Sequence, residues 1–380
     1  KRGIVSQKTC EQKQLFFRIY AQKAWALVFA GNGRMEVSMS IIKEIAAEAG
    51  VSVSTVYNVI NGKHSKVSEK NIELINELIR KKKYVPNMSA KSLTAKSTKI
   101  IGVIVPLGEG DYNFFKDPYL SELIGVVEHS LRKKGYYAMI RSVNLASDIS
   151  TLLKTWNMDG AIFLLPYYEK IVQKIIGSND LPMVFLDSYS DCPDMLSVCI
   201  NDYKGGYIAT KYLINMGHRN IAFAGPIEPG ITEGVVNQRF KGYQSALRDS
   251  NIEYRKDFVF PAMSIYDMGV LIGHDIADRK GEITAVFSTA DIMAIGIMEG
   301  ARRNGLVIPN DLSIVGFDNI EAAIFSTPKL TTISQNISWK AEFAIEQLMN
   351  QIDYGSVDQK RTVLDVELIE RQSVVPRVNA

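Results

Sequence analysis

The stretch from Ile41 to Asn61, IIKEIAAEAGVSVSTVYNVIN, constrains the fold of this chain more than any other. Apolar residues recur at helical spacing before and after a short break. Gly50 suits the end of the first helix because glycine adopts a left-handed backbone without strain, and Ser52 can cap the second helix. The small Ala46 and Ala49 let two helices meet across so tight a turn. The pattern predicts a helix-turn-helix, whose second helix can lie in a DNA major groove.

An ordinary packed pair of helices would show the same pattern, so the segment that follows is needed to distinguish it from a helix-turn-helix. A third helix is predicted from Val67 to Arg80, because Ser68 can cap it and Glu69 suits its positive N-terminal end. Its apolar stripe consists of Ile72, Ile75, Leu78 and Ile79. Four basic residues, 80–83, lie in its last turn, and Pro86 then prevents the helix from continuing.

With these motifs, the chain resembles the lactose-repressor (LacI/GalR) family of bacterial transcription regulators. The family pattern is A-G-V-S-x-x-T-V-x-x-V-(I/L)-N, followed by Y-x-P-N and A-(R/K)-S-L. This chain has AGVSVSTVYNVIN, YVPN and AKSL in the same order and spacing, followed by KIIGVIVP. The resemblance extends to about Pro376. It implies a homodimeric repressor that binds a pseudo-palindromic operator in double-stranded DNA and responds to a small molecule.

The resemblance assigns two groups of residues to DNA binding. Those in and just after the second helix are Val53, Ser54, Thr55, Tyr57, Asn58 and Asn61. Asn58 can read adenine through two hydrogen bonds, whereas Thr55 and Asn61 better suit phosphate contacts and capping. Lys91 and Leu93 belong to a hinge that enters the minor groove, where a leucine wedge exchanges unstacking energy for a bend. A plain linker is the alternative for this segment.

The first 38 residues lie outside the resemblance, and three interpretations of them remain open. They could be a signal peptide, but Arg18, Gln22 and Lys23 interrupt its apolar core and no convincing cleavage site follows. They could also be a genuine, disordered N-terminal arm. The third interpretation is that these residues are translated upstream sequence and that the native start is Met39. It is favoured because the codons for residues 35–37 can contain GGAGGT, a ribosome-binding sequence at a suitable distance before the Met39 codon.

From Lys99 onward, strand-like and helix-like segments alternate, which predicts an α/β fold. The run 100–106 is continuously apolar and β-branched, as is typical of a buried parallel strand. Further strands are predicted at 136–141, 160–165, 183–187, 198–202, 220–224, 285–288 and 313–317. The fold class is therefore an all-α helix-turn-helix head followed by two doubly wound α/β lobes, which resemble periplasmic binding proteins.

The expected domain boundaries follow from this pattern and from the resemblance. The head covers residues 39–86, and the hinge with its linker covers 87–99. The resemblance implies three crossings between the lobes, near residues 202–205, 332–334 and 355. The N-terminal lobe would then contain 100–202 and 335–353, and the C-terminal lobe 203–334 and 354–377.

Polar or aromatic residues at the ends of strands predict an effector site between the lobes, because open α/β sheets bind ligands beyond the carboxyl ends of their strands. The candidates are Tyr119, Asp187, Arg239, Phe287, Asp318 and Gln335. The family match makes Tyr119 a stacking platform and Arg239 the residue that grips the effector. Carboxylates and a guanidinium suit a carbohydrate, since each makes two hydrogen bonds to neighbouring hydroxyls. Arg239 could instead bind a carboxylate or phosphate.

One departure from the family pattern limits this assignment. Sugar-responsive members often have Asn before the aspartate of N-D-x-M-A, whereas this chain has Ala290 before Asp291. A hydrogen bond to sugar is then missing, which argues against a common hexose. Phe287, earlier on the same strand, could pack against the ligand instead.

Motifs of catalysis are not found in the sequence. It has no G-x-S-x-G, no Walker lysine motif and no metal-spaced His/Cys set, so neither an enzyme, a metal nor a cofactor is expected. Asp187 and Asp318 could in principle act as the paired carboxylates of a glycosidase. The alternative function, outside transcription regulation, is that of a periplasmic sugar receptor, which fits the second half of the chain but not the head.

Charge and cysteine content agree with a regulator. Residues 39–99 hold 11 Lys and Arg against 5 Asp and Glu, although the net charge of the chain is only +3. A basic head on an acidic remainder suits a polyanion bound at one end. Three cysteines without metal spacing favour a reduced cytoplasm. No apolar run reaches 18 residues, so no membrane partner is expected.

Overall fold

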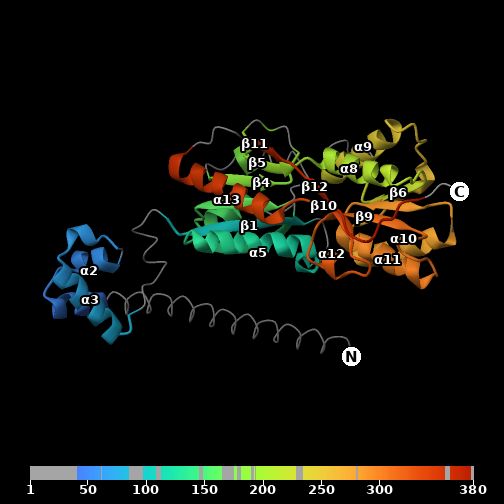
Figure 1. The fold of residues 1–380 in the computed structure, drawn as a ribbon. Helices are drawn as coiled ribbons and strands as arrows, with labels where there is room; N and C mark the ends of the chain where they lie inside the picture. Colours follow the sequence, from blue (N-terminus) through green and yellow to red (C-terminus); the bar gives the residue numbers. More distant parts are fainter. Residues whose placement is uncertain are drawn as a thin grey trace, which may run out of the picture. The chain divides into compact units, whose positions relative to one another are not determined.

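The chain forms two compact units, residues 1–98 and 99–380, which we call the head and the body (Figure 1). The computed structural model describes residues 41–60, 62–84, 97–107, 113–144, 149–164, 175–177, 181–189, 192, 194–227, 234–279, 281–355 and 360–377. The predictions for residues 1–38 and for the hinge at 87–96 lie outside the described residues.

The head is a small helical unit with its own apolar core. A helix at 41–49 is followed by α2 (Val53–Ile60), η1 (His64–Lys66) and α3 (Glu69–Lys81). The buried apolar residues that the helices share are Ile42, Ile45, Ala46, Val56, Val59, Ile75, Leu78 and Tyr84. Gly50 has φ = +66°, the left-handed conformation that its place at the helix end predicted. The predicted helix-turn-helix and third helix are therefore confirmed.

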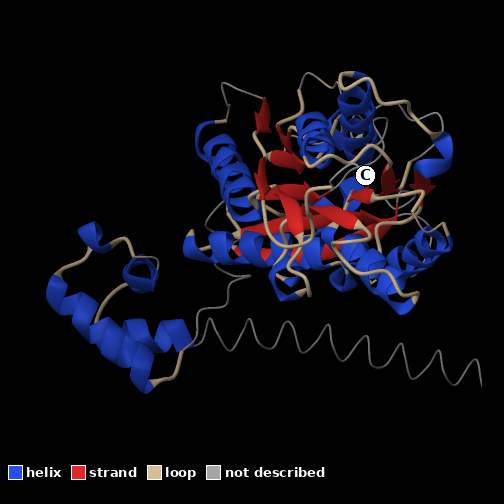
Figure 2. Ribbon diagram, turned by 45° about the vertical axis from the view of Figure 1, so that its right-hand side comes forward, coloured by secondary structure: helices blue, strands red, loops and turns tan. Residues whose placement is uncertain are grey.

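The body contains two lobes, each built around a six-stranded sheet flanked by helices (Figure 2). The N lobe contains sheet A, in the order β11-β5-β4-β3-β1-β2 and parallel throughout. Its strands are β1 (Ile100–Leu107), β2 (Tyr137–Asn144), β3 (Gly160–Leu164), β4 (Met183–Leu186), β5 (Ser197–Ile200) and β11 (Arg361–Leu364). Its other elements are η2 (Phe114–Lys116), α5 (Pro118–Lys133), α6 (Ile149–Thr155) and α13 (Ile337–Tyr354).

The C lobe contains sheet B, in the order β12-β10-β9-β8-β6-β7, with only β12 antiparallel among its described strands. These strands are β6 (Ile221–Gly225), β7 (Val259–Pro261), β8 (Ala285–Ser288), β9 (Ser313–Asp318), β10 (Thr331–Ser334) and β12 (Glu367–Ile369). Its helices are α8 (Asp202–Asn215), α9 (Val235–Arg248), η3 (Lys256–Phe258), α10 (Tyr266–Asp278), α11 (Asp291–Arg303) and α12 (Ala322–Phe325). The predicted pair of doubly wound lobes is confirmed.

The chain crosses between the lobes three times, and the third crossing differs from the prediction. The first lies between β5 and α8, and the second between β10 and α13, which packs on β4, β5 and α5 of the N lobe (Figure 1). The third was expected near Gly355. Instead, β11 pairs with β5 in sheet A, so the crossing lies at Asp365 and Val366, before β12 joins sheet B. Backbone hydrogen bonding to the edge of sheet A keeps this short strand in the N lobe.

Helices α8 and α9 pack closely because glycines replace side chains between them. A Cβ atom on Gly206 would lie 2.0 Å from the carbonyl oxygen of Arg239. One on Gly242 would lie 2.2 Å from the carbonyl oxygen of Tyr203. The backbones can therefore approach to a distance that no larger residue permits, which brings Arg239 beside the start of α8.

No helix in the described part of the chain is long and apolar enough to cross a membrane.

Candidate functional site

In the head, the N-terminal end of α2 presents side chains to solvent. Val53 and Ser54 are exposed, whereas Thr55 and Asn58 are half-buried. Ser52 caps the helix as predicted, since its Oγ accepts a hydrogen bond from the backbone N–H of Thr55 at 3.1 Å. In helix-turn-helix proteins this end of the second helix contacts base edges.

The other residues predicted to bind DNA differ in their surroundings. Tyr57 packs against the head core, so part of its ring is already used by the fold. Asn61, Lys91 and Leu93 lie outside the described residues. Their roles at DNA stay predictions from the sequence.

Part of the basic run after α3 has a structural role. Lys81 forms an ion pair with Glu48 at 2.9 Å, and Lys82 forms pairs with Glu44 at 3.1 Å and Glu48 at 3.2 Å. These contacts join the end of α3 to the first helix. Two of the four positive charges in this run are therefore matched within the head, and a nucleic acid would be attracted less strongly than the run suggests.

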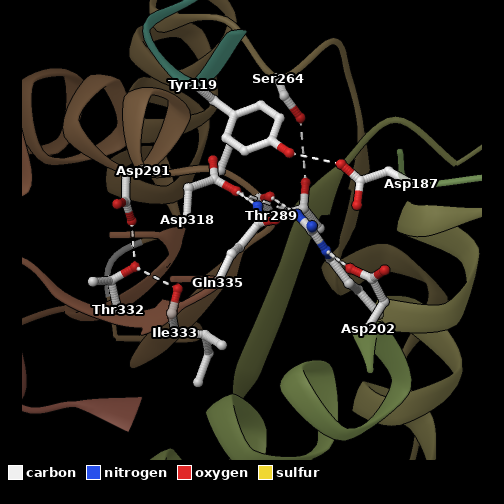
Figure 3. A network of polar contacts seen from close by, with 12 residues as sticks. Tyr119, Asp187, Asp202, Ser264, Thr289, Asp291, Asp318, Thr332, Ile333 and Gln335 are labelled. Carbon is white, nitrogen blue, oxygen red and sulfur yellow. Dashed lines mark hydrogen bonds and ion pairs between the residues drawn. The ribbon is translucent and has the colours of Figure 1, made fainter. Parts of the chain in front are cut away.

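In the body, one polar network includes five of the six residues predicted for effector binding: Tyr119, Asp187, Arg239, Asp318 and Gln335 (Figure 3). Tyr119 and Asp187 come from the N lobe, Asp318 and Arg239 from the C lobe, and Gln335 from the crossing between β10 and α13. The structure thus brings these residues together. Their part in binding a ligand stays a prediction.

The ends of strands position the two carboxylates. Asp187 follows β4 with φ = +58°, and Asp318 ends β9 with φ = +114°. Such angles are unfavourable for residues with a Cβ atom, and strain of this kind concentrates at functional sites. Tyr119 is held at the start of α5, where Asp117 accepts a hydrogen bond from its backbone N–H at 2.9 Å. Strained turns and a capped helix thus direct these side chains to one place.

Lys340 is the centre of the N-lobe half of the network. Its Nζ lies 2.9 Å from both carboxylate oxygens of Asp187 and donates to the Tyr119 hydroxyl at 2.6 Å. It also donates to Oε1 of Gln335 at 2.7 Å. The Tyr119 hydroxyl in turn donates to Asp187 at 2.6 Å. Every buried charge in this half is therefore paired.

Gln335 and Arg239 continue the network into the C lobe. The side-chain amide of Gln335 donates to Oδ1 of Asp318, which lies 3.8 Å from Nη1 of Arg239. Arg239 also donates to Oδ1 of Asp202 at 2.7 Å and to the carbonyl of Thr289 at 2.6 Å. Its guanidinium lies over the ring of Phe317, 3.5 Å from the centroid. The arginine is thus oriented from several sides.

Asp202, at the first turn of α8, joins the first crossing to the same network. Its Oδ2 accepts a hydrogen bond from the hydroxyl of Tyr189, which also donates to the carbonyl of Ile200 at 3.0 Å. Because Tyr189 follows β4 and Arg239 lies on α9, Asp202 connects side chains from both lobes. Two of the three crossings therefore contribute to the network.

The sixth predicted residue, Phe287, lies elsewhere. Its side chain is fully buried and packs against Phe223 and Phe317, with centroid distances of 5.6 Å and 6.4 Å. It therefore belongs to the core beneath Arg239. Asp291, beside the divergent Ala290, accepts hydrogen bonds from Thr332 Oγ1 at 2.5 Å and the backbone N–H of Ile320 at 3.0 Å (Figure 3). Asp291 thus ties β10 to the segment after β9.

Burial alters the acidity of these groups. It raises the pKa of Asp318 to about 7, against the opposing effect of Arg239. It also raises the pKa of Asp202 and that of Asp291. Burial and the neighbouring Asp187 raise the pKa of Tyr119, so its hydroxyl keeps the proton that it donates. Near neutral pH, the network therefore carries less negative charge than its carboxyl groups suggest.

Three members of the network were missed from the sequence: Lys340, Asp202 and Tyr189. Lys340 carried a usable signal, because it lies in the apolar stripe of α13 between Ile337 and Ala344. A lysine at such a position indicates either that it has a buried partner or that the apolar stripe has been predicted wrongly. Among the described residues, no group of three or more His, Cys, Asp or Glu could hold a metal ion.

These features define a class: a DNA-binding head joined to a two-lobed body with a buried polar site between its lobes. Comparison with known proteins gives the same class. Residues 41–87 match the family of bacterial regulatory proteins described as the lacI family. Residues 210–374 match the periplasmic binding protein-like domain. The chain is 32% identical over 346 residues to the HTH-type transcriptional repressor PurR of Photorhabdus laumondii, a match covering 89% of this chain and 97% of that repressor.

Two solved structures share the fold. The complex of the transcriptional regulator CelR with cellobiose is 26% identical, with a TM-score of 0.64 over 87% of this chain and 99% of CelR. The lac repressor dimer bound to operator and an anti-inducer is 23% identical, with a TM-score of 0.75 over 87% of this chain and 98% of the repressor. The chain belongs to the LacI family of bacterial regulatory proteins. It is a DNA-binding regulator controlled by a small-molecule effector.

Proposed function

We propose that the chain is a homodimeric transcriptional repressor whose operator affinity is set by a sugar or sugar derivative bound between the lobes. The observation that carries this proposal is the buried network from Tyr119 to Asp202, to which both lobes and two crossings contribute. A ligand that replaced part of these contacts would change the relative stability of lobe arrangements. Such a differential interaction is what an effector needs in order to shift a conformational equilibrium.

The chemistry of the network supports a polyhydroxylated ligand. Asp187 and Asp318 accept hydrogen bonds, Arg239 donates them, and Gln335 can do both. Neighbouring hydroxyls on a sugar can satisfy such alternating groups, while the Tyr119 ring offers an apolar face. A CelR structure contains cellobiose, and a LacI-family regulator from Enterococcus faecium, 26% identical, was solved with ribose. These relatives support the same ligand class here.

The DNA partner is proposed to be a pseudo-palindromic operator read by two heads. Val53, Ser54 and Asn58 are proposed to read bases, with Lys91 and Leu93 acting at the minor groove. A chromosomal operator implies a cytoplasmic location. We infer that the body binds its ligand without transforming it, because its carboxylates are engaged in ion pairs and hydrogen bonds and its curated relatives are repressors.

Gel retardation tests this function. The DNA fragment is the intergenic region beside the gene, and the panel contains sugars, nucleosides and purines. A specific shift that weakens steeply as salt rises, and that one sugar releases or strengthens, is the expected result. A response to a nucleoside or purine alone would overturn the sugar assignment but keep the regulator. No shift under any condition would favour the receptor interpretation.

A further inference from the structure

Lys340 occupies a position that helical periodicity reserves for apolar side chains. The buried face of α13 contains Ile337, Lys340, Ala341, Ala344, Ile345, Leu348 and Met349. The Lys340 side chain has no exposed surface, and that of Asp187 is 4% exposed. A buried ammonium is costly unless it is paired, so its presence in an apolar stripe needs a reason other than packing.

The contacts of Lys340 use its full hydrogen-bonding capacity. An ammonium has three N–H donors and no acceptor. The acceptors around it belong to three residues: Asp187, Tyr119 and Gln335. No donor is left over for a ligand. Lys340 therefore acts on a ligand through its neighbours, as a positioning residue.

Because Lys340 can only donate, it sets the direction of the hydrogen bonds around it. Gln335 must turn its oxygen toward the ammonium, which leaves its NH₂ to donate to Asp318. The Tyr119 hydroxyl accepts from Lys340 and so gives its own proton to Asp187. A neutral side chain at position 340 would remove one of the two contacts that hold each orientation and leave only the acceptors Asp187 and Asp318. The donors and acceptors offered to a ligand are thus held more firmly by this charge.

We propose that Lys340 determines effector specificity, by fixing the hydrogen-bond directions of Tyr119 and Gln335 and by cancelling the charge of Asp187. This inference rests on the proposed sugar-binding function and deepens it. In the described network, Arg239 and Lys340 face the carboxyl groups of Asp187, Asp202 and Asp318. Both cations are already paired, so the site favours an uncharged ligand over an acidic one.

The test is a charge cycle of four proteins: wild type, Lys340→Met, Asp187→Asn and the double variant. Methionine has a similar length to lysine and keeps the buried volume filled. The probes are ribose, its 2-amino-2-deoxy analogue and riburonate (ribose oxidised at C5), with glucose, glucosamine and glucuronate as a second series. Calorimetry gives the ratio of amino-sugar to uronate affinity for each protein. Lys133→Met is the matched control, since it removes the same charge from the exposed far end of α5.

Lys340→Met is expected to raise this ratio by about tenfold or more, because the site gains a net negative charge in a low-dielectric environment. Asp187→Asn is expected to lower it. The double variant restores the net charge of the wild-type network and is expected to return the ratio toward that of the wild type. Lys133→Met should leave it unchanged.

Two other results would overturn the proposal in distinguishable ways. If Lys340→Met weakened binding of all three sugars of a series equally, with the ratio unchanged, Lys340 would have only a structural role. If the wild-type protein bound none of the six sugars, the sugar assignment would fail and this inference with it. Thermal unfolding of each variant shows whether lost binding reflects lost folding.

Discussion

Two opposing effects act on the pKa of the Asp318 carboxyl group: burial raises it, and the nearby Arg239 lowers it. Its pKa of about 7 in the folded body exceeds the ordinary value of 3.8, so the folded state resists its ionisation. The resulting stability is present below about pH 4 and is lost as the pH rises toward 7. Asp318→Asn should remove this loss. Its free energy of unfolding should therefore exceed that of the wild type by up to about 4 kcal/mol between pH 4 and 8. Denaturant unfolding across this range measures it; parallel curves would contradict the assignment.

Arg239 and Asp202 form an ion pair in which both side chains are almost fully buried. Removing one partner leaves a buried charge without compensation, which typically costs about 3–5 kcal/mol. Arg239→Ala should therefore lower the stability of the body and abolish the effector response, while the head still binds DNA. Adding Asp202→Asn should recover part of the stability but not the response. If Asp202→Asn changed stability by the same amount with and without Arg239, the pair would not be coupled.

Among the elements, the pair α8 and α9 depends on Gly206. A methyl group there would clash with the backbone of Arg239, so Gly206→Ala should push the helices apart, cost about 1–3 kcal/mol and weaken the effector response. Gly125→Ala in α5 is the control, because a Cβ atom there meets nothing within 4 Å. That change should be neutral or slightly stabilising. Thermal unfolding compares the two variants, and equal melting temperatures would refute close packing.

The recognition surface of α2 can be tested by Asn58→Ala. If Asn58 reads adenine, its loss should relax the preference at one base position per half-site and cost about 1–3 kcal/mol for the preferred base. Selection of binding sites from random DNA measures this preference. Lys63→Ala is the comparison, since it removes an exposed positive charge of the head and should weaken binding to all sequences alike. An unchanged binding motif would mean that another side chain reads this position.

The elements were predictable to different degrees, for physical reasons. Long runs with clear periodicity, such as β1 and α3, were predicted closely because the spacing of their apolar residues can be read from the local sequence. β11 was assigned to the wrong lobe because its partner, β5, lies more than 150 residues earlier in the chain. Lys340 was missed because a lysine usually indicates a surface. Phe287 was proposed as a ligand contact from its place on the strand before Asp291, because the sequence does not show that its side chain packs against Phe223 and Phe317.

For the whole molecule, thermodynamics links the two functions. If the effector changes operator affinity by some factor, the operator must change effector affinity by the same factor. We therefore expect calorimetric titrations of the effector, with and without saturating operator, to differ by the ratio found in gel retardation. A Lys340→Met protein that still binds its ligand should obey the same equality. Unequal factors would indicate that a further equilibrium, such as a change of oligomer, enters one of the two measurements.

The place of β11 in sheet A has a consequence for how the chain is made. Ribosomes deliver residues in order, at about 5–20 per second. The edge partner of β5 therefore emerges roughly 10–30 seconds after β5 itself, once most of the C lobe has been synthesised. During that interval, the nascent N lobe exposes an apolar strand edge, which is prone to pair with other chains. Premature termination before β11 would leave this edge permanently open, so truncated products should aggregate rather than accumulate as free lobes.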